Sequence, residues 1–313
     1  MSITSLICNL LCVSAVNRRG ARERRELQTV TKMISIPSKH TSRTTTISST
    51  DKLILAASSY LNSAPLIWSF LNTDRQHQIE FSEAVPSRCA QLLRQSEAEV
   101  ALIPVIEYQR ITGGCLVPDV CVGSKQEVLS VVLVSKNTEL RNIRTVALDE
   151  SSRTSATLVK IIFKEFLQRD PEWTTCSPDL AGMLEQNDAA LIIGDPGMTF
   201  PRAGLKVWDM ASLWRNYTDL GFVFAMWMVR DDAEDKARSI DFASARDEGV
   251  LQIETIVQEY KNKIPLSVDD LRRYLTQNIV FEVDESMRRG LGLYYELAHK
   301  HGLIDAVKPL RFL

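Results

Sequence analysis

The chain has 313 residues, of which 45% are apolar and 24% charged, as expected for a globular protein with a large core. One or two domains is the expectation at this length. The net charge of −2 combines about +6 in residues 1–50 with about −8 in the rest of the chain. An acidic body argues against nucleic acid or an anionic membrane surface as a partner.

The six cysteines are scattered, with no C-x-x-C pair and no pair of histidines nearby. This pattern predicts neither a zinc site nor a disulfide framework. Reduced thiols in a cytoplasm are the simplest interpretation, so we expect a cytoplasmic protein without a metal.

Residues 1–50 are rich in Ser and Thr and show no hydrophobic periodicity, so we expect a disordered extension that the folded protein does not need. The apolar segment 6–13 precedes the arginines, whereas a secretory signal has its positive charge first. It is also too short to span a bilayer. The sequence leaves open whether Met1 or Met33 is the true start.

From Lys52 onward, short apolar segments alternate with helical patterns, which predicts an α/β fold with mainly parallel sheets covered on both faces. Strands are expected over 53–57, 79–81, 98–103, 128–134, 145–148, 189–193 and 221–229. The chain is expected to be helical from 248 onward. The two long apolar segments 128–134 and 221–229 suggest two lobes joined by two crossings, with 52–133 plus 225–313 in one lobe and 134–224 in the other.

Four polar turns follow predicted strands, at 58–63, 104–107, 149–155 and 194–197. Ligands of open α/β sheets bind at the carboxyl ends of strands, so these turns predict a cleft site between the lobes. The turn 149–155 leads from a strand into a helix, and unpaired backbone N–H groups with small hydroxyls there suit an anion. Arg153 could add a planar fork for a carboxylate. The alternative is a well-capped helix in which Ser151 or Ser152 is merely the cap.

Several common chemistries lack their motifs: the sequence has no G-x-G-x-x-G, no phosphate-binding P-loop and no G-x-S-x-G. The four histidines, at 40, 77, 299 and 301, fall outside the predicted cleft turns. Asp195 could act as a general base, or it could simply form the turn between Gly194 and Pro196. Asn62 could orient a substrate or cap a helix.

Seven segments in order carry a family resemblance. They read YLNSAPL at 60–66, VPSR at 85–88, ALIP at 101–104, EVLSV at 127–131, LDESSRTS at 148–155, AALIIGDP at 189–196 and FVFAMW at 222–227. Together they resemble the chorismate dehydratase family, the first enzymes of the futalosine route to menaquinone. One departure is visible at 218–223, where the family usually reads Thr-Gly-Leu-Pro-Phe-Val and this chain has Asp219 and Gly221 in place of the Gly and the Pro.

The resemblance implies a two-lobed type II periplasmic-binding-protein fold used as a cytoplasmic enzyme. It implies conversion of chorismate to 3-[(1-carboxyvinyl)oxy]benzoate with loss of water, without metal or organic cofactor. It also places Asn62 at the catalytic position, with one carboxylate of the substrate as the base. The candidate substrate-binding residues are Tyr60, Ser63, Ser130, Ser151, Ser152, Arg153, Thr154, Ser155, Asp195 and Phe222.

Two other functions stay open. One is a plain ligand-binding protein of the same fold, because a fold does not fix a function. The other is the sister enzyme 1,4-dihydroxy-6-naphthoate synthase, which is expected to carry a cleft histidine and a Thr-Thr turn. Here the corresponding turn, 152–155, reads Ser-Arg-Thr-Ser. The oligomeric state is not predicted.

Overall fold

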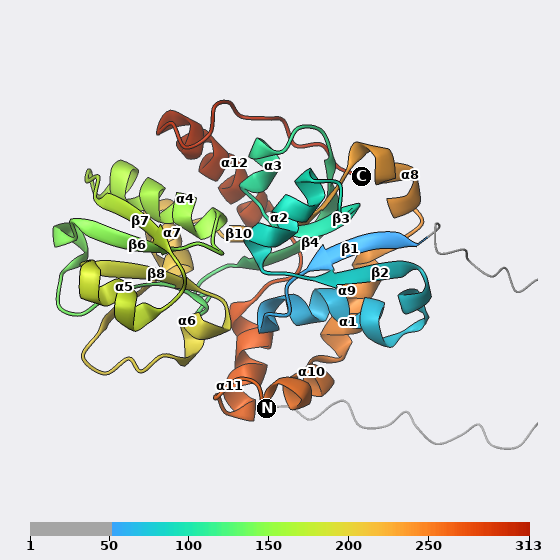
Figure 1. Cartoon of the computed structure of the whole chain (residues 1–313), viewed down its shortest axis with the longest axis horizontal. Helices are drawn as coiled ribbons and strands as arrows, with labels where there is room; N and C mark the ends of the chain where they lie inside the picture. The colour runs from blue at the N-terminus through green and yellow to red at the C-terminus, as the bar shows by residue number, and fades with distance from the viewer. Residues whose placement is uncertain (1–51) are drawn as a thin grey trace, which may run out of the picture. The chain divides into compact units, whose positions relative to one another are not determined.

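A computed structural model of the chain describes residues 52–313, so the predicted N-terminal extension lies outside the described residues. The described part contains two five-stranded sheets, which we call sheet A and sheet B (Figure 1). Sheet A has the strand order β2-β1-β3-β10-β4 and sheet B the order β7-β6-β8-β5-β9. A mixed α/β architecture, as the sequence predicts, is confirmed.

The strand bounds show which parts of the chain build each sheet. Sheet A consists of β1 Leu53–Ala57, β2 Ile79–Glu83, β3 Val100–Pro104, β4 Cys115–Ser124 and β10 Phe222–Val229. Sheet B consists of β5 Val131–Ser135, β6 Thr145–Asp149, β7 Glu172–Cys176, β8 Ala189–Ile193 and β9 Lys206–Asp209. The chain passes from sheet A to sheet B at 125–130 and returns after β9.

The predicted lobe boundaries, at 133/134 and 224/225, fall inside β5 and β10. Each of these strands pairs along its length within a single sheet, β5 in sheet B and β10 in sheet A. The segments that cross between the sheets are therefore the connections before these strands, because a strand cut in two would leave its backbone unpaired.

The sheets are mixed, whereas the sequence pattern predicts mainly parallel sheets. In sheet A, β1 is parallel to β2 and β3, whereas β10 is antiparallel to β3 and β4. Sheet B repeats the arrangement: β6 is parallel to β7 and β8, whereas β5 is antiparallel to β8 and β9. Strands β3, β5 and β8 are buried along their whole length, which explains their unbroken apolar sequences.

The α-helices follow the strands. They are α1 Ala64–Asn72, α2 Pro86–Arg94, α3 Glu107–Arg110, α4 Thr154–Ile161, α5 Leu180–Gln186, α6 Asp195–Thr199, α7 Met210–Thr218, α8 Glu234–Ala237, α9 Phe242–Leu251, α10 Ile253–Tyr260, α11 Val268–Arg273 and α12 Glu285–Lys300. Short 3₁₀ turns include Leu61–Ser63, and π-helical turns extend α4 over Ile162–Phe166 and α11 over Tyr274–Asn278. No helix within 52–313 is long and apolar enough to cross a membrane.

Local sequence explains where several helices begin. Pro65 and Pro86 lie in the first turns of α1 and α2, where a missing N–H costs nothing. Ser267 accepts the N–H of Asp270 at 3.1 Å and donates its hydroxyl to the Asp270 carboxylate at 2.6 Å, so its side chain caps the start of α11.

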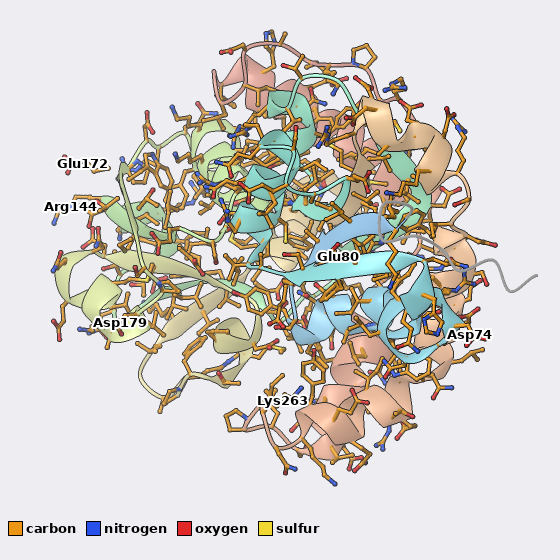
Figure 2. The ribbon with its side chains drawn as sticks, turned by 45° about the vertical axis from the view of Figure 1, so that its right-hand side comes forward. Asp74, Glu80, Arg144, Glu172, Asp179 and Lys263 are labelled. Atoms are coloured by element: carbon orange, nitrogen blue, oxygen red, sulfur yellow. The ribbon has the colours of Figure 1, made fainter. Side chains whose placement is uncertain are left out.

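The outer strands of both sheets carry exposed charged side chains. Glu80 lies on β2 and Glu172 on β7, and Figure 2 shows both on the outside of the fold. Charges on edge strands discourage pairing with another chain. The buried face of each sheet is instead covered by helices, with α2 against β1 and β3 and α5 against β8.

Candidate functional site

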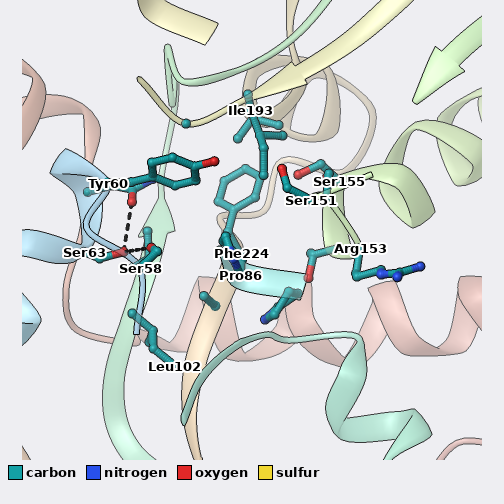
Figure 3. Close-up of a pocket in the computed structure, with 18 of the residues that line it drawn as sticks. Ser58, Tyr60, Ser63, Pro86, Leu102, Ser151, Arg153, Ser155, Ile193 and Phe224 are labelled. Carbon is teal, nitrogen blue, oxygen red and sulfur yellow. Dashed lines mark hydrogen bonds between the residues drawn. The ribbon is translucent and has the colours of Figure 1, made fainter. Parts of the chain in front are cut away.

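A cavity lies at the carboxyl ends of strands from both sheets (Figure 3). It has about 580 Å³ of empty space, including the part open to solvent. All four of the predicted polar turns contribute to its lining. The lining residues are Ser58, Tyr60, Asn62, Ser63, Pro86, Leu102, Pro104, Val122, Val128, Val131, Ser151, Ser152, Arg153, Thr154, Ser155, Ile193, Gly194, Phe224 and Ala225.

One wall is the turn between β6 and α4, and Asp149 fixes its conformation. The buried carboxylate accepts the N–H of Ser151 at 2.8 Å and its hydroxyl at 2.6 Å. The other carboxylate oxygen accepts the N–H of Ile193 from β8 at 3.4 Å. Burial raises the pKa of Asp149, and these donors oppose the rise. The sequence interpretation left Asp149 out of the site, although it organises the turn.

The start of α4 presents hydrogen-bond donors at this wall. The first N–H groups of a helix have no intrahelical partner, and at the start of α4 no side chain caps them. The hydroxyl of Ser152 is buried and has no hydrogen-bond partner among the described residues. Ser155 is also buried beside the cavity, and Arg153 is exposed at its edge. Such donors suit a carboxylate, because a buried polar group without a partner calls for a ligand or water.

Thr154 lines the cavity and also makes two hydrogen bonds to other elements. Its hydroxyl accepts the N–H of Ile106, the residue before α3, at 3.3 Å. Its carbonyl accepts the hydroxyl of Tyr294 from α12 at 2.9 Å. Through these two hydrogen bonds Thr154 connects the start of α4 to α12 and to the residue before α3.

The opposite wall is the turn between β1 and α1. The amide oxygen of Asn62 accepts the hydroxyl of Ser63 at 3.2 Å, and the Ser63 hydroxyl is 2.9 Å from that of Ser58. Figure 3 shows Tyr60 and Ser63 on one side of the cavity, and Ser151, Arg153 and Ser155 on the other. The structure therefore brings the predicted catalytic amide and the predicted anion-binding turn to facing walls.

The Tyr60 hydroxyl keeps its proton at neutral pH. Burial raises the pKa of Tyr60, and the negative charges of Asp149 and Asp195 add to the rise. Its ring lies against Gly194, where a Cβ atom would be only 2.8 Å from the ring. Gly194 has φ of +69°, a conformation that favours glycine.

Three of the predicted site residues do not line the cavity. Ser130 is fully buried, and its hydroxyl accepts that of Tyr274 at 2.7 Å. The carboxylate of Asp195 accepts the N–H of Leu61 at 3.1 Å instead of facing the cavity.

Phe222, the third of these residues, packs into the core beside the cavity. Its ring is covered by Trp214, Tyr294 and Phe224, at ring-centroid distances of 5.4, 5.1 and 4.7 Å. Phe224 lines the cavity instead. Residues two apart on a strand share a face, so the sequence pattern could not tell which of the two rings lines the cavity.

Sequence reasoning also missed Tyr274 and most of the apolar lining. Tyr274 comes from the π-helical turn after α11, and burial raises the pKa of its hydroxyl, with Ser130 and Asn62 opposing the rise. In the sequence, Tyr274 belongs to the apolar face of an amphipathic helix, and this pattern does not indicate that the residue lies beside the site. Val122 was missed because β4, with Pro118 and Asp119 in its middle, has no clear strand pattern.

The histidines within the described range do not line the cavity. His77 and His299 are exposed, and His301 lies 2.7 Å from the carboxylate of Glu165. In the range 52–313 no three His, Cys, Asp or Glu side chains gather in a way that could hold a metal ion.

Comparisons with known proteins give a consistent result. A family model described as menaquinone biosynthesis matches residues 53–300. The chorismate dehydratase of Thermus thermophilus is 29% identical over 264 residues, which cover 78% of this chain and 94% of that protein.

Solved structures share the fold. A protein from Archaeoglobus fulgidus has a TM-score of 0.68 at 20% identity, over 82% of this chain and all of that one. The periplasmic aliphatic sulphonate binding protein from Escherichia coli has a TM-score of 0.56 at 14% identity, over 84% of this chain and 94% of that one. At these identities the likeness shows the fold alone, and it confirms the expected periplasmic-binding-protein fold.

Proposed function

We propose a reaction from one premise: the chain belongs to the menaquinone-biosynthesis family. The proposed reaction is the elimination of water from chorismate to give 3-[(1-carboxyvinyl)oxy]benzoate, which would make the protein a lyase. The similarity to a chorismate dehydratase over most of both chains supports it. The proposal places the protein in the cytoplasm, acting on a small molecule without metal or organic cofactor.

The observation that carries the proposal is the unpartnered hydroxyl of Ser152 beside the uncapped start of α4. Chorismate has two carboxylates, and one of them would accept hydrogen bonds from Ser152 and from the free N–H groups of the first turn. Arg153, at the edge of the same wall, would add a charge-assisted contact. Ser151 is less available because its hydroxyl donates to Asp149.

Asn62 would orient the reacting part of the substrate from the opposite wall. A carboxamide can donate to one oxygen and accept from another, which fixes the ring against its base. The second carboxylate of the substrate would take the ring proton, and the electrons of the broken C–H bond would form the new ring double bond. The ring hydroxyl leaves and takes up that proton from the carboxylate, so that one water molecule is released. Aromatisation of the ring drives the step. Apolar lining residues such as Leu102, Val131 and Phe224 would limit access of bulk water.

The two alternatives are less well supported. The naphthoate synthase is expected to use a cleft histidine, and the lining of the cavity contains none. A plain binding protein shares the fold, but the likeness to the sulphonate-binding protein is at a level that shows only the fold.

The test is to incubate the purified full chain with chorismate alone and to follow loss of chorismate and appearance of the aromatic product by chromatography and mass. Formation of 3-[(1-carboxyvinyl)oxy]benzoate at a rate that scales with enzyme supports the proposal. Tight chorismate binding without turnover would favour a binding protein, and neither binding nor turnover would reject chorismate as the substrate.

A further inference from the structure

Asp195 follows a strand of sheet B, and it makes a hydrogen bond to a turn that follows a strand of sheet A. It is the first residue of α6 and follows β8 and Gly194 in sheet B. Its Oδ1 accepts the N–H of Leu61 at 3.1 Å, although the two residues are 134 positions apart in the chain. Leu61 begins the 3₁₀ turn Leu61–Ser63, and Tyr60 before it makes no side-chain cap. Asp195 therefore supplies, from sheet B, the cap that this turn of sheet A lacks.

A second contact of the same kind lies beside the first. Gly194 packs so closely on Tyr60 that a Cβ atom would be 2.8 Å from the ring. Residues 194–195 thus contact residues 60–61, and Asn62 is the next residue in the chain. Both contacts therefore act on the backbone that leads directly into Asn62.

The surroundings of Asp195 fit a structural acceptor rather than a base. The residue lines a separate pocket with Ser59, Glu83, Tyr260 and Lys263, and it is absent from the lining of the cavity. Burial raises the pKa of Asp195 to about 6, and the N–H of Leu61 opposes the rise. At neutral pH most of it is ionised, so the contact with Leu61 is charge-assisted.

We propose that Asp195 is a positioning residue that holds Asn62 in its reactive place from the opposite sheet. It acts through Leu61 and does not take the proton in the reaction. The inference rests on the proposed function only in giving Asn62 a role in turnover.

Two substitutions separate positioning from proton abstraction. Asp195→Asn keeps an oxygen that accepts the N–H of Leu61 but cannot act as a base, whereas Asp195→Ala removes the acceptor. Asp195→Ala should lower kcat about tenfold or more with a small change in KM, because a misplaced reacting group costs up to about a hundredfold. Asp195→Asn should stay within about threefold of the unaltered enzyme, since a neutral acceptor retains part of the bond. A loss in Asp195→Asn as large as in Asp195→Ala would identify a base and overturn the inference.

The path through Asn62 is tested by combining Asp195→Ala with Asn62→Ala. If Asp195 acts by placing Asn62, the double variant should turn over about as slowly as Asn62→Ala alone. Independent, multiplying losses would overturn the inference. Asp179→Ala is the matched control, because Asp179 is exposed before α5 and makes no side-chain capping bond.

Hydrogen exchange supplies a readout that does not need turnover. The N–H of Leu61 should exchange faster in Asp195→Ala than in the unaltered chain, and at a near-normal rate in Asp195→Asn. Unchanged exchange in Asp195→Ala would overturn the inference even if chorismate is the substrate. If the chain does not convert chorismate, the proposed function fails while the exchange result still decides the role of Asp195. Should Asp195→Ala not fold, Asp195→Asn decides both turnover and exchange.

Discussion

Asn62 occupies a turn whose polar atoms already serve one another. Its amide oxygen accepts from the hydroxyl of Ser63, which also pairs with Ser58, so Ser63 keeps a hydrogen-bond partner when the Asn62 side chain is removed. Removing the Asn62 side chain should therefore affect turnover more than folding.

The first prediction is that Asn62→Ala lowers kcat by a factor on the order of 10² or more, because an oriented polar contact at a reacting centre contributes about 2.7–4 kcal/mol. Thermal stability should change little. Asn62→Asp should be at least as damaging, since it puts a negative charge beside a dianion. Asn216→Ala, at an exposed position on α7, is the control. Near-normal turnover with a loss of several degrees in Tm would show that Asn62 only caps the turn.

Neighbouring serines at 151 and 152 should respond in opposite ways. Ser152→Ala removes a hydroxyl without a partner, so stability should hold, whereas chorismate affinity should fall about ten- to a hundredfold with the loss of about 1.5–3 kcal/mol. Ser151→Ala removes a donor from the buried carboxylate of Asp149 and should cost stability on the same scale. Calorimetric binding and thermal unfolding of both variants measure this. Equal affinity in Ser152→Ala and the unaltered chain would contradict the carboxylate contact.

The carboxylate of Asp195 should make stability depend on pH. Its pKa in the folded protein, about 6, is above its ordinary value of 3.8, so folding favours the protonated form. That contribution is present below about pH 4 and is lost as the pH rises through about 6. Asp195→Asn does not titrate, so its Tm relative to the unaltered chain should rise between pH 4 and pH 7 and then level off. A relative Tm that falls over this range would mean that folding stabilises the ion.

At the scale of the elements, helix α12 packs closely against the residue before β10, and a glycine makes this close approach possible. A Cβ atom on Gly290 would lie 2.1 Å from the carbonyl oxygen of Gly221, just before β10. Gly221 also donates its N–H to the hydroxyl of Ser286 at 3.0 Å. The proline that the family resemblance implies at this position has no N–H to donate. The departure noted in the sequence is therefore matched by a contact with α12.

Two glycines of α12 test this packing against each other. Gly290→Ala should destabilise the fold by about 1–3 kcal/mol, because the helix must move away from Gly221. Gly292→Ala meets no atom within 4 Å and should stabilise the same helix by about 0.5–1 kcal/mol. Denaturant unfolding of both variants gives the comparison. Equal effects of the two substitutions would show that α12 is not held at Gly290.

Elements with a clear local sequence pattern could be predicted, whereas contacts between distant parts of the chain could not. The buried strands 53–57 and 189–193 match β1 and β8, because continuous apolar runs mark strands covered on both faces. Strands β4, β7 and β9 were missed, since each mixes polar residues into a strand at the edge of its sheet. The polar turns were found from their place after strands. Contacts such as that of Asp195 with Leu61 were not, because they join distant parts of the chain.

At the scale of the whole molecule, the α/β class followed from alternation of strands and helices. The mixed direction of each sheet did not, since nothing local distinguishes an antiparallel strand buried on both faces from a parallel one. The same limit explains why the predicted boundaries fell inside β5 and β10. A long apolar segment marks a strand but does not say which sheet it joins.

The place of β10 in sheet A has a consequence for the order in which the protein folds. Sheet B is built from one continuous stretch, 131–209, whereas among the strands β4 pairs only with β10, which is synthesised after sheet B is complete. A growing chain can thus close its second sheet before its first. In a chain ending at residue 218, sheet B should resist limited proteolysis while 115–124 is cut, and protection of both segments would contradict this order. Sheet A, whose first strand leaves the ribosome before any strand of sheet B, is therefore the last of the two sheets to be completed.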